Sequence, residues 1–280
     1  MFQMGRRFTG RVRSVCVLLF VALWVTHSVA AADRQQLKTF LEVTGFDVAL
    51  DSIALNAVDA PAMLGMSAND FTSNWKRATE DVFAQEKLHS LAYEILDQTL
   101  SDTLLTHAVD FYGSDLGQRL VVAENISHMM EDNDAKQEKG AALIADASDA
   151  RIAELTRLAE AVDSAGSAIA AVQEVQVRFL MAASHAGVLD DELDEGMLRA
   201  LLKQSETELR ATLKLSNLNN GAYSYREFSD EDISDYADAL EHPLMQQVYQ
   251  LMNAILFEVT AQRFEELAVR MADLQSGESL

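Results

Sequence analysis

Apolar residues recur at spacings of three and four along almost the whole chain, and no segment alternates apolar and polar residues as a strand does. A spacing of three and four places side chains on one face of an α-helix. Only two prolines, Pro61 and Pro243, occur in 280 residues. One long amphipathic stripe near the C-terminus consists of Leu244, Val248, Leu251, Ile255, Val259, Leu267, Met271 and Leu274. The pattern predicts an all-α, multi-helix bundle.

Local signals set the limits of several helices. Gly45 is expected to stop the first helix, and the second ends before Pro61 because a proline disfavours helix in the residue before it. Ser67 and Asp70 have the spacing of a capping box. Asn and Gly residues at 217–221 predict a turn. The helices predicted in this way are 34–44, 46–58, 67–83, 86–100, 172–185 and 191–215.

Residues 133–175 are rich in alanine, with interspersed charges and few large apolar side chains. Because alanine is the best helix former, we predict one long connecting helix that packs through a narrow stripe of Ala, Leu and Ile. The chain then divides into a signal peptide at 1–32, an N-terminal helical unit at 33–132, the connecting long helix at 133–175 and a C-terminal helical unit at 176–280.

The two units share an internal repeat. Residues 100–125 align without gaps on residues 228–253, with six identical positions. In each copy a serine, Ser101 or Ser229, is expected to cap a helix of about three turns, which breaks before a second helix begins. Pro243 suits the first position of the second helix in the later copy. The alternative is a chance similarity of the kind that amphipathic helices share. In the repeat interpretation, the two helix–break–helix units pack together.

The N-terminus has the pattern of an export signal. Four arginines precede an apolar run from Val15 to Val25, and small residues follow it. Cleavage is expected after Ala32, with Ala30 and Ala31 as alternatives. The run is too short to span a bilayer, which needs about 20 residues. We therefore predict a periplasmic or secreted protein that does not span the membrane, and whose mature chain has no cysteine because Cys16 leaves with the signal.

The net charge excludes one class of partner. The whole chain carries a formal charge of −22, and the predicted signal contains four arginines and no acidic residue, so the mature chain is more acidic still. Nucleic-acid binding needs a basic footprint. We therefore expect no nucleic-acid partner, and a basic protein remains a possible partner for the acidic surface.

The segment FYGSDLGQRL at 111–120, preceded by a Ser-Asp helix cap, resembles an exported bacterial family named domain of unknown function 2059. Phe111, Tyr112, Gly117 and Arg119 fit its pattern of a short helix, a small-residue break and a glycine that opens a long helix. The second copy fits less well, with Ala-Leu in place of Phe-Tyr and Met245 in place of the glycine. The resemblance implies an exported helical protein without an assigned activity, and it carries over no catalytic residue.

Candidate metal sites are incomplete in the sequence. Glu86 and His89 have the spacing found in di-iron helical bundles, but a second such pair is missing, since Glu124 and His128 are four residues apart. Acidic runs at 131–134 and 190–196 lack the register of an EF-hand. We therefore predict no metal site, no cofactor and no catalytic residue, since a nucleophile elbow and a phosphate-binding glycine loop are missing as well.

The function predicted from these features is non-catalytic: an envelope interaction or accessory module that binds a protein partner or an apolar ligand between its helices. Structural or ligand-facing residues are expected at Phe111, Tyr112, Gly117 and Pro243. The alternative is a metal-dependent hydrolase that uses carboxylate and histidine side chains. A third hypothesis is a homodimer held by the apolar stripe between 244 and 274.

Overall fold

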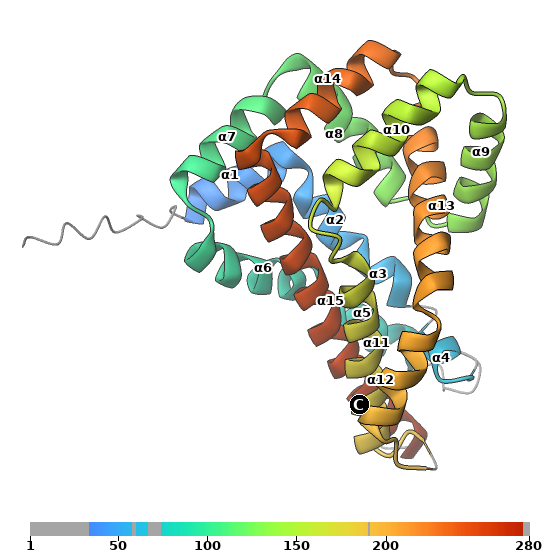
Figure 1. Cartoon of the computed structure of the whole chain (residues 1–280). Helices are drawn as coiled ribbons and strands as arrows, with labels where there is room; N and C mark the ends of the chain where they lie inside the picture. The colour runs from blue at the N-terminus through green and yellow to red at the C-terminus, as the bar shows by residue number, and fades with distance from the viewer. Residues whose placement is uncertain (1–33, 58–59, 67–73, 190, 277–280) are drawn as a thin grey trace, which may run out of the picture.

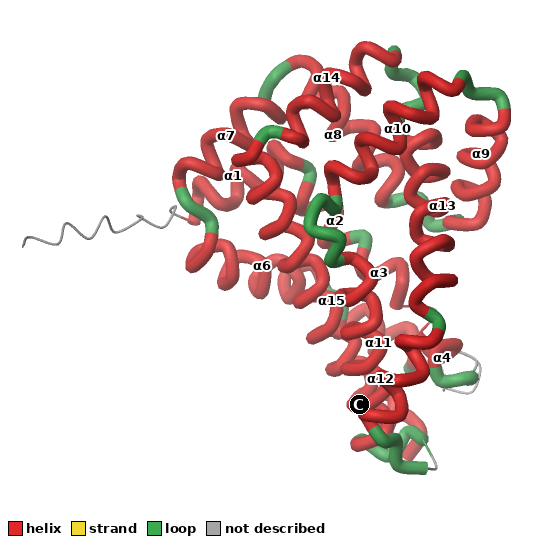
Figure 2. Tube along the Cα trace, in the orientation of Figure 1, coloured by secondary structure: helices red, strands yellow, loops and turns green. Residues whose placement is uncertain are grey.

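The computed structural model describes residues 34–57, 60–66, 74–189 and 191–276. The predicted signal peptide, its cleavage residues Ala30 and Ala32, and the predicted cap at Ser67 lie outside these ranges. Within them every regular element is a helix (Figure 2), which confirms the all-α prediction. No helix in the described ranges is long and apolar enough to cross a membrane.

The first N-terminal helix has the bounds predicted from the sequence, whereas the second is divided. Helix α1 (Arg34–Thr44) ends at Gly45, which has a φ of 71°, a conformation that glycine adopts without the steric cost of a side chain. The second predicted helix is divided into α2 (Phe46–Asp51) and α3 (Ile53–Asn56). The Ser52 hydroxyl, at the division, donates to the Ala49 carbonyl and so competes with the backbone ladder. The next elements are α4 (Ala60–Met63), α5 (Trp75–Val82) and α6 (Gln85–Thr99).

Both copies of the proposed repeat form a helix, a break and a second helix. The first copy gives α7 (Asp102–Tyr112) and α8 (Asp115–His128), and the second gives α14 (Asp230–Glu241) and α15 (Pro243–Ser276). The Ser101 and Ser229 side chains accept hydrogen bonds from backbone amides three residues later, as expected of N-caps. Helix α7 packs against α15, so the two copies are in contact.

The single long helix predicted over 133–175 is wrong. The segment contains α9 (Asn133–Ala145), α10 (Asp149–Val162) and the first part of α11 (Ala168–His185). Ser148 caps α10 with its hydroxyl, and Gly166 adopts a φ of 63° before α11 begins. Alanine propensity makes each piece helical, but it does not prevent capping residues from starting a new helix. The chain turns between the pieces, and the division into domains remains a prediction.

The turn predicted at 217–221 is also wrong, because α13 (Glu206–Ser224) passes through it. The side chains that favour turns form hydrogen bonds with a residue of α9 instead. The Gln137 side-chain amide donates to the Ser216 hydroxyl at 2.9 Å and to Asn220 Oδ1 at 2.7 Å, and it accepts from the Asn219 side chain. Polar side chains that bond to another helix no longer compete with their own backbone. The short α12 (Glu195–Gln204) precedes α13.

Helix α15 is the centre of the fold (Figure 1), and it packs against α5, α6, α7, α10, α11 and α14. Its apolar stripe is buried within the monomer: Ile255 is 1% exposed and Val259 is fully buried. Leu251 is partly buried and packs on the same core. The stripe is therefore not available as a dimer interface, because it is already buried within the monomer.

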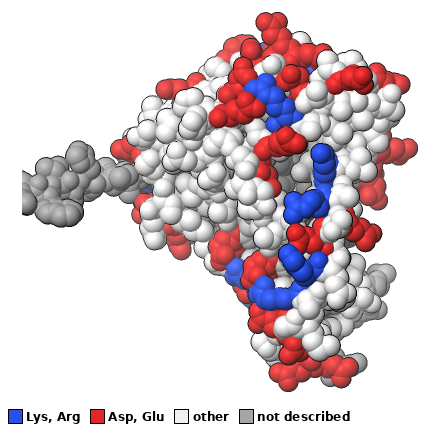
Figure 3. All heavy atoms as spheres, in the orientation of Figure 1, with Lys and Arg blue, Asp and Glu red and all other residues white. Residues whose placement is uncertain are grey.

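Basic side chains on the face drawn in Figure 3 lie among acidic ones rather than forming a separate patch. Arg157 of α10 pairs with Asp238 and Glu241 of α14. Arg178 of α11 pairs in the same way with Glu258 and Glu265 of α15. Each of these two guanidinium groups thus joins two helices.

Candidate ligand-binding site

A cluster of four tyrosines and one glutamate joins the two repeat copies. Tyr112 ends α7 and Glu124 lies on α8, while Tyr236 of α14 and Tyr249 of α15 come from the second copy. The fourth tyrosine, Tyr225, follows α13 directly. The chain has only six tyrosines, so four of them meet at this point. We call these five residues the Tyr-Glu cluster.

Hydrogen bonds in the cluster converge on Glu124. Its Oε1 atom accepts from the Tyr225 hydroxyl at 2.6 Å and from the Tyr236 hydroxyl at 2.9 Å. The Tyr236 oxygen also lies 3.0 Å from that of Tyr112 and 2.8 Å from that of Tyr249. Because Tyr236 donates to the carboxylate, it accepts from its tyrosine neighbours. The hydroxyl protons are thus oriented toward Glu124.

Aromatic packing holds the cluster in place. The Phe111 ring stacks on that of Tyr236, with centroids 5.8 Å apart and an angle of 8°. Tyr225 and Tyr112 both contact the Tyr236 ring edge to face. These offset and edge arrangements are the favourable ones for aromatic pairs. Tyr236, with an exposure of 1%, is the buried centre of the group.

The electrostatics keep the hydroxyls as donors. Desolvation raises the pKa of all four tyrosines above the ordinary 10.0, and the nearby Glu124 charge raises it further. Desolvation also raises the pKa of Glu124, although the hydrogen bonds from Tyr225 and Tyr236 act in the opposite direction. The four tyrosine hydroxyls therefore stay protonated at neutral pH.

Two cavities adjoin the cluster. The larger cavity has a volume of about 280 Å³ and lies between α8, α9, α10 and α13. The smaller cavity, of about 170 Å³, lies between α1, α2, α8 and α15. Both are lined by Glu124, His128, Val162 and Tyr249. Glu124 thus lines both cavities.

The smaller cavity lies between equivalent parts of the repeat. Glu124 and Asn125 line it from the first copy, and the aligned residues Met252 and Asn253 line it from the second. The Asn253 amide donates to the Val162 carbonyl at 2.9 Å. Asn125 Oδ1 is buried and has no hydrogen-bond partner among the described residues. The two copies are therefore not equivalent in chemistry, since the acid is present in one copy and an apolar methionine takes its place in the other.

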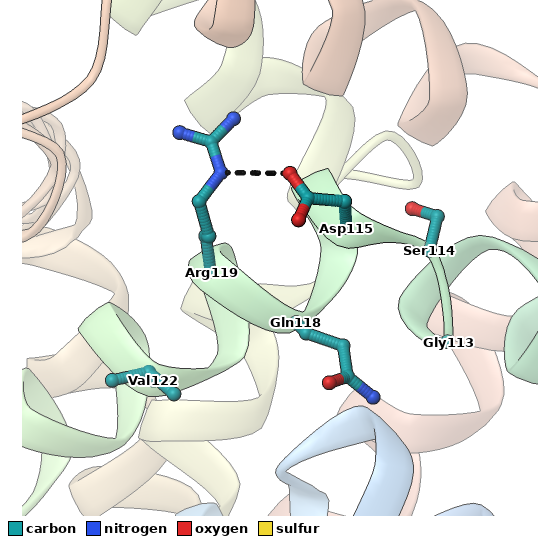
Figure 4. Close-up of a pocket in the computed structure, with 6 residues that line it drawn as sticks. All are labelled: Gly113, Ser114, Asp115, Gln118, Arg119 and Val122. Atoms are coloured by element: carbon teal, nitrogen blue, oxygen red, sulfur yellow. Dashed lines mark ion pairs between the residues drawn. The ribbon is translucent and has the colours of Figure 1, made fainter.

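A more open hollow lies at the start of α8 and has a volume of about 430 Å³. All six residues that line it come from the single stretch 113–122. Figure 4 shows Arg119 and Asp115 paired on one side of the helix, while Gln118 points to another side. These side chains do not converge on a common point, so the hollow is a weaker ligand site than the cavities at the cluster.

The predicted site residues fall into two groups. Tyr112 is 3% exposed, belongs to the cluster and lines the smaller cavity, while Phe111 supports the Tyr236 ring. Gly117 and Pro243 have backbone roles: Gly117 allows α8 to pass against the end of α7, and Pro243 begins α15. The cleavage residues Ala30 and Ala32 remain a prediction.

Sequence reasoning missed the centre of the site. The sequence analysis considered Glu124 only as a possible metal ligand together with His128. It did not consider Tyr225, Tyr236 or Lys136. The residues of the cluster lie up to 137 positions apart in the chain. The repeat alignment was the one available signal, because it brings 112–124 and 236–249 into one structural unit.

The break between α7 and α8 carries the expected family resemblance. Residues 86–146 match the family model described as an uncharacterised protein conserved in bacteria, domain of unknown function 2059. The resemblance is confirmed. The matched stretch includes Tyr112, Glu124 and Lys136, while the second copy lies outside it. No curated protein and no solved structure matches the chain significantly.

The raised pKa of Glu124 gives a pH dependence to folding. The folded chain holds this proton at pH values where the unfolded chain has released it, so its contribution to stability falls as pH rises above 4.5. We expect Glu124→Gln to gain stability relative to the wild type as pH rises through that range. Urea unfolding of both proteins at a series of pH values measures the difference.

The neighbouring titratable groups do not reverse the expected direction of this stability change with pH. The four tyrosines stay protonated, and Lys136, whose pKa desolvation lowers, is present in both proteins, so its own contribution cancels. Desolvation and Lys136 lower the pKa of His128, but His128 is present in both proteins and its own contribution cancels. A stability difference that stays constant with pH would contradict the assignment of a raised pKa to Glu124.

Proposed function

We propose that the protein is a non-catalytic binding module of the cell envelope, which holds a small ligand with an apolar body between its helices. The observation that carries the proposal is the pair of adjoining cavities that share Glu124. Ligand sites are concave, mostly apolar and equipped with a few converging polar groups. The larger cavity has this character, because Leu155, Leu158 and Val162 supply apolar walls beside the Tyr-Glu cluster.

The envelope location rests on the N-terminal pattern of four arginines, an apolar run and small residues. A periplasmic protein meets small molecules that have crossed the outer membrane, and it acts without direct access to nucleotides of the cytoplasm. A helical module that takes up such a ligand serves as a carrier or a sensor. The ligand-binding hypothesis accounts for the cavities, which the protein-partner hypothesis does not.

The metal-dependent hydrolase has less support. Among the described residues, no group of three or more His, Cys, Asp and Glu side chains could hold a metal ion. His89, one of the two histidines considered for such a site, binds Asp51 at 2.8 Å. His89 is therefore engaged with Asp51 rather than directed at His128, and no second observation favours the hydrolase.

Native mass spectrometry of protein purified from the periplasm tests the proposal. The wild type should carry a discrete additional mass that denaturation releases. Ala159→Trp places a large side chain at the wall of the larger cavity and should reduce the bound fraction at least about tenfold, because the ligand and the indole compete for the same space.

Ala153→Trp is the matched control, since it makes the same change on an exposed face of α10 and should retain the ligand. Circular dichroism establishes that both variants are folded. A bare mass for the wild type, or equal retention of ligand by both variants, would overturn the cavity as the binding site and favour a protein partner.

A further inference from the structure

Two histidines meet where the two repeat copies are in contact. His107 lies on α7 of the first copy, and His242 lies between α14 and α15 of the second. Their rings stack with centroids 4.4 Å apart and an angle of 27° between the planes. Two neutral imidazoles can stack in this way, whereas two imidazolium cations would repel each other at this distance. The contact therefore depends on the protonation state of both rings.

The His242 side chain also caps the central helix α15. Its Nδ1 atom accepts a hydrogen bond from the backbone amide of Leu244 at 3.2 Å. In the repeat alignment His242 takes the place of Ser114, whose hydroxyl accepts from the Gly117 amide at the start of α8. A serine hydroxyl accepts at any pH, but an imidazole accepts only through an unprotonated nitrogen. A second proton on His242 would therefore occupy the atom that caps α15.

The start of α15 disfavours a cation for a second reason. The N-terminus of a helix carries a partial positive charge, which acidic side chains in the first turn usually balance. Helix α15 has no acidic residue in its first turn, and its first charged residue is Glu258. A protonated His242 would thus face the helix dipole without a compensating acid on the same helix.

The charges around the pair leave the neutral rings favoured. Desolvation and the His242 charge lower the pKa of His107 from its ordinary 6.5, and the charge of Asp110 on the same helix opposes them. The neighbouring helices α1, α8, α10 and α14 carry ion pairs, which join Lys38 with Glu42, Arg119 with Asp115 and Asp232, Arg151 with Asp230, and Arg157 with Asp238 and Glu241.

We propose that His107 and His242 form an acid-sensitive contact between the two repeat copies. At neutral pH the two neutral rings stack and His242 caps α15. As the pH falls, protonation removes the cap, places a cation at the start of α15 and makes the two rings repel each other. Neither histidine lines the two cavities at the Tyr-Glu cluster, but α7 ends at Tyr112 and α15 carries Tyr249. Acid thus loosens the contact between the helices that bring these tyrosines together.

The expected effect is a loss of stability at acid pH. Because the folded chain disfavours a proton on His107, the unfolded chain binds more protons in the range below pH 6.5, and stability falls as the pH falls. The contribution of Glu124 has the opposite direction, since its pKa is raised in the folded chain. A comparison of variants that all keep Glu124 therefore isolates the histidine pair.

Urea unfolding of the wild type and of His242→Ser at about pH 7.5 and about pH 5.5 tests the contact. The serine supplies the kind of cap that Ser114 gives to α8, and it does not titrate in this range. Between the two pH values, the unfolding equilibrium constant of the wild type should rise at least about fivefold more than that of His242→Ser, because the variant keeps its cap and gains no cation. A difference between the two proteins that stays constant with pH would overturn the proposal.

His185→Ser is the matched control. His185 is exposed and ends α11, and a cation is favourable at a helix C-terminus. The same substitution at this position should therefore not reproduce the relative gain in stability at acid pH. An equal gain for His185→Ser would show a general effect of removing a histidine and would also overturn the proposal.

A double-mutant cycle tests whether the two rings act as a pair. His107→Gln removes one of the two charges and keeps a polar side chain on α7. At about pH 5.5 this change should lower the unfolding constant at least about twofold more in the wild type than in His242→Ser, because the repulsion is present only in the wild type. Equal effects in both backgrounds would overturn the contact between the rings. Circular dichroism at neutral pH establishes that each variant is folded.

Discussion

Replacing Gly117 with alanine should lower the free energy of unfolding by about 3 kcal/mol or more. A Cβ atom at this position would lie 2.3 Å from the Phe111 carbonyl oxygen and 2.6 Å from the Tyr112 Cα atom. Both are backbone atoms, so the contact cannot be relieved by a change of rotamer. The gain in helix propensity, about 1 kcal/mol for alanine over glycine, is smaller than this strain.

The same substitution should also disturb the proposed ligand site. Relief of the clash requires the end of α7 to move away from α8, and Tyr112 is the last residue of α7. Its hydroxyl would then leave Tyr236 and Tyr249, which it contacts in the cluster. We therefore expect a loss of ligand retention in native mass spectrometry as well as a lower midpoint of urea unfolding.

Gly196→Ala is the control for this variant. Gly196 also lies in the first turn of a helix, but its added Cβ would meet only an Asp194 side-chain oxygen at 3.2 Å. That side chain can shift, so we expect a change within about 1 kcal/mol. If the two variants unfold at the same urea concentration, the close approach at Gly117 does not limit stability.

Replacing Gly140 with alanine should be equally severe, with a loss of about 3 kcal/mol or more. Here the added Cβ would lie 2.1 Å from the Asn219 carbonyl oxygen and 2.7 Å from its carbonyl carbon. Helices α9 and α13 touch backbone to backbone at this point, so they would have to separate. Separation would break the hydrogen bonds from Gln137 to Ser216 and Asn220.

The expected consequence extends to the larger cavity, since α9 supplies Lys136 and α13 supplies Asn217 and Asn220. Gly221→Ala is the matched control on α13. Its added Cβ would meet only Leu155 Cδ2 at 3.6 Å, an ordinary contact, and alanine should be neutral or stabilise the helix by up to about 1 kcal/mol. Thermal and urea unfolding of the three proteins measure the contrast, and a stable Gly140→Ala protein would contradict the close contact.

The Tyr-Glu cluster shows how the two helix–break–helix segments bring side chains that are distant in sequence together. The break at Gly113 and Ser114 ends α7 just after Tyr112 and starts α8 so that Glu124 follows three turns later. The second copy ends α14 and starts α15 so that Tyr236 and Tyr249 face the first copy. The two helix–break–helix segments thus present different side chains to one cluster: an acid and one tyrosine from the first, and two tyrosines from the second.

The sequence alone determined the features that depend on short stretches of chain. The helix spacing, the stop at Gly45 and the serine caps of α7 and α14 follow from contacts within about five residues. The break motif around Gly117 also belongs here, because the steric limit arises from Phe111 and Tyr112 nearby. Such features can be predicted because their partners are adjacent in sequence.

Tertiary structure decided the features whose partners are distant. Gln137 of α9 turned the predicted turn at 217–221 into helix, because it took up the side chains that would otherwise have competed with the backbone. The meeting of Glu124 with Tyr225 and Tyr236 spans more than 100 residues. Neither propensity nor periodicity specifies which helices pack together, and so the cavities and the Tyr-Glu cluster appear only when the helices are assembled.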